Sequence, residues 1–260
     1  MRILITGSSK GLGRATALAL AERGHHVIAT ARTASTLADL PVAQRLTLDV
    51  TSDSSVREAI AAAGPIDVVI NNAAEIFVAP LESAPLAEVQ RLYDINVFGT
   101  LRVIQAVAPQ MRERKAGTIV NISSVVAHAS LPLTGVYCST KWAIEALSES
   151  LRFELGHFGV RVVVVEPGQI GTGALDAPQA FFGPNDPYLP LAAAGKKTTR
   201  EEMTTPAEIA RTIVEAVESP GDKFRWPAGA DAVAVINARK QQDDAAFEQT
   251  VRAYRGLERW

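Results

Sequence analysis

The chain has 260 residues, of which 47% are hydrophobic, and its net charge at pH 7 is −2. This length and apolar content can bury one large core, so a second domain is not required. The charge, with an isoelectric point near 6.1, excludes the basic bias of a nucleic-acid-binding protein. The single cysteine, Cys138, excludes an internal disulfide, and the four histidines lack the spacing of metal ligands.

A strand is predicted at residues 2–6, followed by a glycine-rich turn and an alanine-rich helix at 13–23. Glycine permits positive φ and a close backbone approach to a ligand. The helix start offers unpaired amides and the positive end of a dipole to a pyrophosphate. A turn that needs glycine only for its shape has a similar signature. We expect a dinucleotide to be bound by the loop residues Gly7, Ser9, Lys10, Gly11, Leu12 and Gly13.

The next predicted strand, 26–31, ends at Arg32, and no Asp or Glu follows it. A carboxylate there would bond a ribose 2′-hydroxyl and favour NAD(H), whereas a guanidinium suits a 2′-phosphate. Lys10 adds a second positive charge inside the glycine loop. The two cations predict NADP(H) as the cofactor; the alternative is that both are ordinary exposed charges.

Strand and helix patterns alternate along the rest of the chain. Strands are predicted at 45–48, 66–70, 117–122 and 160–166, and helices at 53–63, 85–113, 137–157 and 206–218. This alternation predicts an α/β fold of the Rossmann type, a doubly wound parallel sheet in three layers that forms a single domain over 1–260. Ligands bind beyond the carboxyl ends of such strands. The loops that carry Gly7, Asn71, Ser124 and Pro167 are therefore expected to line one cleft.

The predicted helix 137–157 begins with Tyr137, and Lys141 lies one turn later on the same face. A nearby ammonium lowers the pKa of a phenol and lets it exchange protons with an alcohol. Ser124, 13 residues before the tyrosine, can donate to and accept from the same substrate oxygen. The three residues predict an acid-base site. A half-buried ring beneath a solvated charge is the plainer reading of a Tyr and a Lys at this spacing.

Taken together, these motifs resemble those of the short-chain dehydrogenases/reductases over most of the chain. The glycine loop is similar to the family pattern TGxxxGxG, and Ser124, Tyr137 and Lys141 stand in its catalytic positions. The resemblance implies that Asn96 kinks a helix and relays protons through water. It further implies that the cofactor is contacted by Asp49, Val50, Asn72, Ala73, Ala74, Tyr137, Lys141, Pro167, Gly168, Ile170 and Thr172.

Ala74 departs from the family, which usually has glycine at this position; a left-handed backbone there would cost alanine roughly 1 kcal/mol. The pair of Lys10 and Arg32 resembles the NADP-preferring carbonyl reductases, and other stretches look closest to hydroxysteroid or retinol reductases. In the family, the helices near 85–113 and 137–157 commonly build a homodimer or homotetramer.

The segment 171–205 interrupts the alternation with four prolines and three aromatic residues. Long loops in compact domains are often functional, so this segment is a candidate substrate lid; the alternative is an exposed irregular excursion. An apolar pocket is expected to receive a hydrophobic carbonyl substrate, which we expect to contact Ser124, Tyr137, Phe77, Leu131 and Phe181.

The function predicted from the sequence is reversible hydride transfer between NADP(H) and a carbonyl or secondary alcohol. We expect a cytoplasmic enzyme, because no leader pattern opens the chain and no apolar run reaches the ~18 residues of a membrane span. Two alternatives remain open. One is a protein that senses NADP without catalysis, and the other is a redox-neutral lyase or epimerase that uses the same tyrosine.

Overall fold

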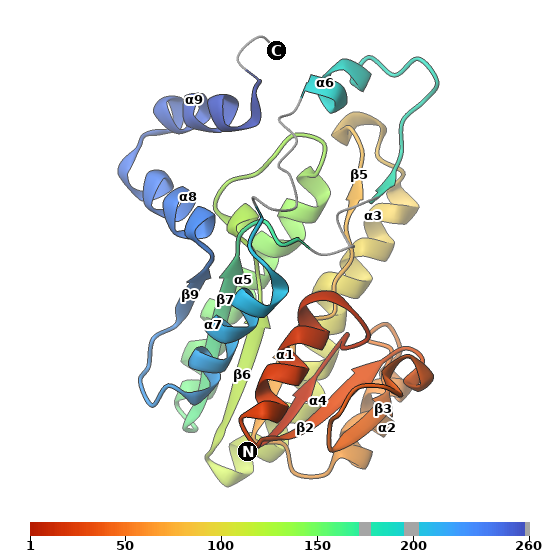
Figure 1. Ribbon diagram of the computed structural model, residues 1–260, viewed down its shortest axis with the longest axis vertical. Helices are drawn as coiled ribbons and strands as arrows, with labels where there is room; N and C mark the ends of the chain where they lie inside the picture. The colour runs from red at the N-terminus through yellow and green to blue at the C-terminus, as the bar shows by residue number, and fades with distance from the viewer. Residues whose placement is uncertain (172–177, 195–202, 258–260) are drawn as a thin grey trace.

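Seven parallel strands form the central sheet of the protein (Figure 1). The structure is a computed structural model that describes residues 1–171, 178–194 and 203–257. The strand order is β3-β2-β1-β4-β6-β7-β9. From β1 the chain first adds strands on one side and then, from β4 onward, on the other, so the strand order switches between β1 and β4. The strands are β1 (Arg2–Ile5), β2 (His26–Ala31), β3 (Gln44–Thr47), β4 (Val68–Asn71), β6 (Gly117–Ile122), β7 (Val160–Pro167) and β9 (Arg225–Ala228).

Helices cover both faces of this sheet and give three layers. Helices α1 (Gly11–Glu22) and α7 (Pro206–Glu218) pack on one face. Helices α2 (Asp53–Ala63), α4 (Gly99–Arg114) and α5 (Gly135–Gly156) pack on the other. Because successive strand residues point to opposite faces, Ile3 and Ile5 of β1 belong to the first core and Leu4 to the second. The predicted Rossmann-type fold is confirmed.

The helix predicted at 85–113 is divided into three parts. Helix α3 (Leu86–Tyr93) continues into a π-helical turn, η3 (Asp94–Phe98), and then into α4. A π-turn is a local widening of a helix that is often found near functional sites. Asn96 lies inside this turn and is buried. Asn96, the residue expected to kink the helix, thus lies in the π-turn between α3 and α4.

Three elements near the C-terminus were not predicted. Strand β9 contains Pro227, which argues against a strand in the middle of a sheet but is tolerated at an edge, and β9 is the edge strand. Helices α8 (Ala230–Gln241) and α9 (Asp244–Arg255) follow it. In Figure 1 they lie at the upper end of the molecule, beyond the carboxyl ends of the strands.

The described part of the segment 171–205 contains regular secondary structure. Strand β8 (Gln179–Ala180) pairs with β5 (Phe77–Val78) in a separate two-stranded sheet, and helix α6 (Leu189–Ala194) follows. This pairing holds the segment against the loop after β4. Thr172 lies outside the described residues. The remaining short elements are the 3-10 turns η1 (Ala34–Leu37), η2 (Leu81–Ser83) and η4 (Val125–Ala127).

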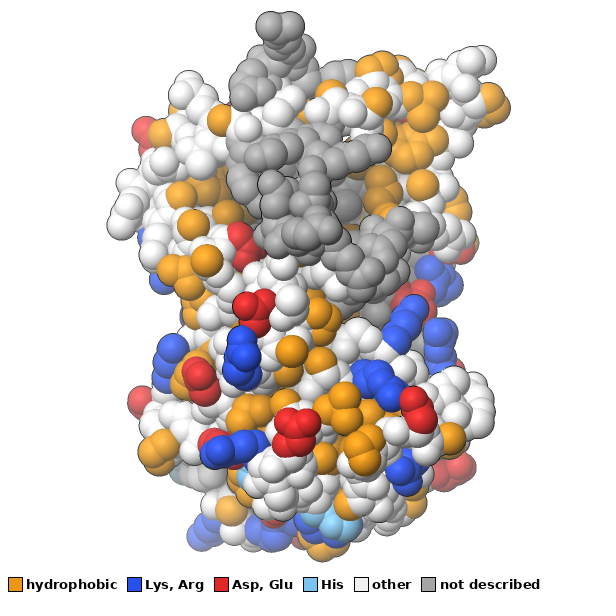
Figure 2. Space-filling model, viewed as in Figure 1, with side chains coloured by type: hydrophobic (Ala, Val, Ile, Leu, Met, Phe, Trp, Pro, Cys, Tyr) orange, Lys and Arg blue, Asp and Glu red, His pale blue; other side chains and the backbone are white. Residues whose placement is uncertain are grey.

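On the face shown in Figure 2, Lys and Arg side chains are spread mainly over the lower half, and apolar side chains are prominent in the upper part around the undescribed residues. None of the helices in the described ranges has both the length and the apolar content needed to cross a membrane.

Candidate active site

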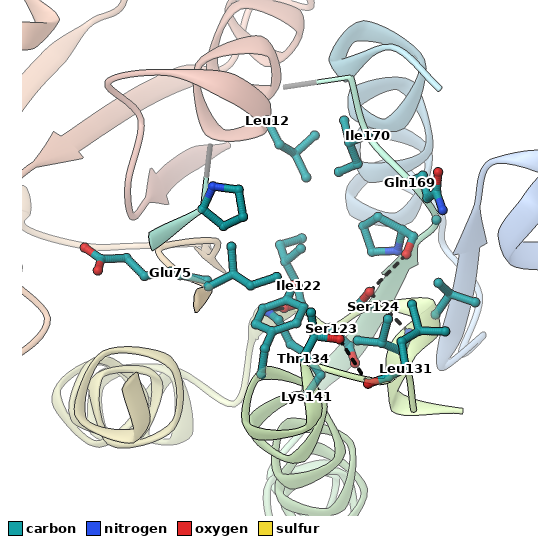
Figure 3. Close-up of a pocket in the computed structure, with 18 of the residues that line it drawn as sticks. Leu12, Glu75, Ile122, Ser123, Ser124, Leu131, Thr134, Lys141, Gln169 and Ile170 are labelled. Carbon is teal, nitrogen blue, oxygen red and sulfur yellow. Dashed lines mark hydrogen bonds between the residues drawn. The ribbon is translucent and has the colours of Figure 1, made fainter. Parts of the chain in front are cut away.

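A cavity of about 1560 Å³ lies at the carboxyl ends of the strands. The loops after β1, β2, β4, β6 and β7 all contribute to it, as predicted for a doubly wound sheet. Figure 3 shows Ser124 and Lys141 facing the pocket, with Leu12 and Ile170 on its opposite side. The predicted cofactor residues that line it are Gly7, Ser9, Lys10, Gly11, Leu12, Gly13, Arg32, Asp49, Val50, Asn72, Ala73, Ala74, Tyr137, Lys141, Pro167, Gly168 and Ile170.

The glycine loop has the backbone that a dinucleotide requires. Gly7 and Gly11 have φ of 71° and 57°, in the left-handed region that favours glycine. A Cβ on Gly13 would overlap the carbonyl oxygen of Gly7, so only glycine fits at position 13. No side chain caps the start of α1, and the residues of its first turn, Gly11, Leu12 and Gly13, line the cavity. These features fit a pyrophosphate group.

The segment after β4 is hydrogen-bonded to the glycine loop. Asn72 Nδ2 donates to the carbonyl oxygens of Thr6 and Gly7, at 2.8 and 3.1 Å, and the Ala73 amide donates to Thr6 Oγ1 at 3.0 Å. Ala74 does not have positive φ, a conformation that only Lys115 and Leu133 adopt among the described non-glycine residues. The departure from the usual glycine at position 74 therefore causes no left-handed strain.

Arg32 lies at the edge of the cavity, where the sequence predicted a contact to a 2′-phosphate. Its Nη1 is 3.4 Å from Glu75 Oε1, and Arg91 Nη1 lies 2.5 Å from the other carboxylate oxygen. Both Glu75 and Arg91 line the cavity but were missed in the sequence, because neither belongs to a motif. Lys10 has no ionic partner among the described residues and is exposed.

Ser124, Tyr137 and Lys141 all line the cavity. Lys141 Nζ lies 5.7 Å from the centre of the Tyr137 ring and donates a hydrogen bond of 2.8 Å to the carbonyl oxygen of Ile122. Only 4% of Lys141 is exposed. Ser124 Oγ donates to the carbonyl oxygen of Pro167 at 3.4 Å, which also links the serine to the turn after β7. The predicted constellation is therefore assembled in space.

The pKa shifts in this group differ from the expectation drawn from the sequence. Burial raises the pKa of the Tyr137 phenol above its usual value, and the Ser124 hydroxyl lowers it by a smaller amount. Burial also lowers the pKa of Lys141 to about 8, against the opposing charge of Glu145. The sequence predicted a lowered pKa for Tyr137. In the folded chain burial dominates, and Tyr137 is a neutral phenol at pH 7.

Asn96 does not line the cavity. Its Nδ2 donates to the carbonyl oxygen of Glu75 at 2.9 Å and to Thr140 Oγ1 at 3.1 Å, and its Oδ1 accepts from the Glu75 amide at 2.9 Å. The side chain thus joins the loop after β4 to α5. The water relay through Asn96 stays a prediction, whereas its positioning of Glu75 is visible.

The structure changes the expected list of substrate contacts. Leu131 lines the cavity, but Phe77 is only 1% exposed and lies in a separate core cluster with Leu92 and Val136. Phe181 packs edge-on against Phe77, with ring centres 5.5 Å apart, and does not line the cavity. The pairing of β5 with β8 turns both rings inward. We therefore withdraw Phe77 and Phe181 as substrate contacts.

A buried charged cluster behind Ser124 was also missed. His128 Nε2 lies 2.6 Å from Glu166 Oε1, and Arg225 Nε lies 3.0 Å from Glu145 Oε2. The two carboxylates and His128 are close enough together to hold a cation, but Arg225, also 3.8 Å from Glu166, already supplies the positive charge. The cluster connects β7, β9, α5 and the turn after Ser124.

The turn after β7 is shaped by Asp231 of α8. Asp231 Oδ2 accepts from the Gln169 amide at 2.7 Å, and a Cβ on Gly168 would lie 2.0 Å from Asp231 Oδ1. Buried oxygens of Gln169 and Asp231 lack a hydrogen-bond partner among the described residues. Both residues line the cavity, although these two oxygens are themselves buried.

The fold and the site define a class of doubly wound α/β protein with a glycine-rich dinucleotide loop and a Ser-Tyr-Lys group. The family model for short chain dehydrogenases matches residues 1–180. The chain belongs to this family and is therefore an oxidoreductase, whose members act on alcohol or carbonyl groups with NAD(H) or NADP(H).

Individual relatives are similar over most of their length. A 3-ketodihydrosphingosine reductase of Bacteroides thetaiotaomicron is 35% identical over 87% of this chain and 87% of its own. Retinol dehydrogenase 8 of Bos taurus is 35% identical over 86% of this chain and 80% of its own. The crystal structure of a short chain dehydrogenase from Burkholderia cenocepacia in complex with NADP is 26% identical. It has a TM-score of 0.79 and covers 99% of this chain and 97% of that one.

The lowered pKa of Lys141 predicts a pH dependence of stability. Between pH 8 and the usual 10.5, the unfolded chain keeps a proton at residue 141 that the folded chain has released. The free energy of unfolding of the wild type should therefore rise with pH in this window relative to Lys141→Met, by about 3 kcal/mol over the whole window. Urea denaturation at pH 8, 9 and 10 measures the difference. Parallel curves for the two proteins would contradict the burial effect.

Proposed function

We propose that the protein is an NADPH-dependent reductase of hydrophobic ketones or aldehydes. The observation that carries the proposal is the neutral Tyr137 phenol held beside Ser124 and Lys141 in the cavity that also contains the glycine loop. A neutral phenol is the form that donates a proton to the developing alkoxide in a reduction.

NADPH supplies the hydride when it is bound. Tyr137 donates the proton to the oxygen of the carbonyl as it becomes an alkoxide. Ser124 orients this oxygen through its hydroxyl, and the ammonium of Lys141 stabilises the phenolate that remains. The hydrogen bond from Lys141 to Ile122 fixes the ammonium during the step and leaves its other N–H donors free. In oxidation the same groups act in reverse, with Tyr137 as the base.

The far end of the cavity supports an apolar substrate. Beyond Ser124, its wall is formed by residues of α6, α8 and α9 that are mainly aliphatic or aromatic, namely Leu191, Ala234, Val235, Phe247 and Val251. Apolar surface of this kind stabilises a ligand by burial at roughly 25 cal/mol per Å². The names of two relatives refer to 3-ketodihydrosphingosine and to retinol. We retain 171–205 as the proposed lid, with Leu131 as a substrate contact.

NADP(H) is proposed over NAD(H) on the charges at the adenosine end of the cavity. Arg32 and Lys10 both line it, and Arg32 stands after β2, where a carboxylate would favour NAD(H). A similar structure contains NADP. The residues present thus fit a 2′-phosphate.

Replacing Tyr137 by phenylalanine tests the mechanism. Removal of the phenol oxygen should lower kcat by about 10²- to 10⁴-fold, because the proton donor is lost, while the Kd of NADPH changes little. A panel of ketones, aldehydes and alcohols assayed by nicotinamide absorbance, with titration of NADPH in parallel, gives both numbers. Turnover by the variant close to that of wild type would remove Tyr137 from the mechanism.

The same panel, run with NADPH deuterated at C4, separates the reductase from the two alternative functions. Deuterium in the product with stoichiometric loss of NADPH identifies a reductase. Product formation without net loss of NADPH identifies a lyase or epimerase. Binding of NADPH with no turnover of any carbonyl identifies a sensing protein.

Reversing the charge of Arg32 tests the choice of cofactor. Arg32→Glu places a carboxylate beside the expected 2′-phosphate, so NADPH should bind at least about tenfold more weakly, as expected for the loss of a charged hydrogen bond of 1.5–3 kcal/mol. NADH should bind as well as to the wild type or better. Fluorescence titration with both nucleotides measures the two affinities. An unchanged ratio of NADPH to NADH affinity would contradict the assignment.

We also propose a homodimer or homotetramer in the cytoplasm. Trp142 and Phe153 on α5 are 47% and 77% exposed, which fits an apolar interface on this helix, and the unpaired Cys138 fits a reducing compartment. Light scattering should give two or four times the chain mass of 27.7 kDa, and Phe153→Glu should shift the protein towards the monomer. A wild-type monomer at micromolar concentration would contradict the assembly.

A further inference from the structure

Glu75 stands between two arginines at the mouth of the cavity. Arg32 Nη1 approaches one of its oxygens at 3.4 Å, and Arg91 Nη1 approaches the other at 2.5 Å. Arg91 in turn pairs with Glu88, whose Oε2 is 2.7 Å from Arg91 Nε. The four side chains thus form a row of alternating charge that ends at Arg32, the group expected to meet a 2′-phosphate.

The sheet order explains why this row lies over the cofactor site. Strand β1 lies between β2 and β4, Arg32 follows β2, and Glu75 follows β4. The pair therefore joins the two segments that flank the glycine loop after β1. Figure 3 places Glu75 on the side of the pocket opposite Gln169, so the ion pair is at the end of the cavity away from the turn after β7.

Glu75 is fixed in place, whereas Arg32 is not. Asn96 accepts from the Glu75 amide and donates to its carbonyl oxygen, both at 2.9 Å, which anchors the backbone. Arg91 holds the carboxylate with the shorter of the two ion pairs. The Arg32 side chain is 72% exposed, and exposed ion pairs are worth only about 0–1 kcal/mol. A ligand can therefore displace Glu75 from Arg32 at small cost.

We propose that Glu75 is a specificity-determining residue that weakens the preference of the site for a 2′-phosphorylated nucleotide. This inference rests on the proposed function, since it assumes that a pyridine dinucleotide binds in the cavity. A 2′-phosphate must replace Glu75 as the partner of Arg32, and the two anions repel each other. Glu75 keeps Arg91 as its partner after the exchange, so no buried charge is left alone. A nucleotide without the 2′-phosphate leaves the pair of Arg32 and Glu75 intact.

The test is a set of affinity measurements on the full chain with NADP⁺, NAD⁺, 2′,5′-ADP and 5′-ADP by calorimetry. Glu75→Gln keeps the size of the side chain and removes its charge. We expect NADP⁺ and 2′,5′-ADP to bind about threefold to tenfold more tightly to this variant, the effect of roughly 1 kcal/mol of charge interaction. NAD⁺ and 5′-ADP should change less than about twofold, and the gain should shrink as salt screens the charges.

Two further variants identify the source of the effect. Glu88→Gln removes the same charge from the next carboxylate in the row, which does not line the cavity. It should leave all four affinities within about twofold of wild type, because a charge farther from the 2′-phosphate interacts with it more weakly and is screened by salt. In an Arg32→Ala background, Glu75→Gln should no longer raise the affinity for NADP⁺ and 2′,5′-ADP appreciably. The effects of substitutions at two interacting residues are not additive.

The outcomes separate this inference from the proposed function. If wild type binds neither dinucleotide, the proposed function itself fails. If wild type binds NADP⁺ but Glu75→Gln changes NADP⁺ and NAD⁺ equally, or neither, Glu75 does not determine specificity. An equal gain in Glu88→Gln would mean that net charge alone is responsible, which also overturns the inference. Thermal unfolding of each variant confirms that it is folded.

Discussion

The burial of Lys141 is the constraint on which the rest of the site depends. The residue is 4% exposed, and its ammonium donates a hydrogen bond to the end of β6 within an environment that lowers its pKa to about 8. An ammonium in such a place needs compensation, which hydrogen bonding and the charge of Glu145 one turn later supply. Because α5 carries Tyr137, Lys141 and Glu145 in successive turns, the packing of this one helix against β6 and β7 sets the charge and position of the proton donor.

Hydrogen bonds and ion pairs behind the cavity also position the residues of the site. The His128–Glu166 pair joins the turn that follows Ser124 to the residue that precedes Pro167, and Ser124 itself donates to the Pro167 carbonyl. The serine and the turn after β7 are thus tied together twice, once at the cavity and once beneath it. Arg225 on the edge strand completes the buried cluster. The C-terminal strand and helices, which carry no family motif, therefore help to hold the parts of the site that do.

The two ends of the cavity differ in the burial and pairing of their side chains. At the proton-transfer end, Ser124 and Lys141 are buried, and Lys141 donates a hydrogen bond of 2.8 Å to Ile122. At the adenosine end, Arg32 is mostly exposed and shares Glu75 with Arg91. Exposed ion pairs are weak and are screened by salt. The chemistry is therefore fixed by the interior of the fold, whereas the choice between two closely related nucleotides depends on a few surface charges that single substitutions can adjust.

By itself, the sequence determined the parallel α/β architecture, the glycine loop and the Ser124, Tyr137 and Lys141 group, because each is encoded in hydrophobic periodicity or in a spacing of a few residues along the chain. Only the tertiary structure decided the partners of Arg32, the cluster around Glu166, the strand that tolerates Pro227, and the inward packing of Phe77 and Phe181. It also reversed the expected pKa shift of Tyr137. These features depend on burial and on contacts between segments distant in sequence, neither of which a local pattern contains.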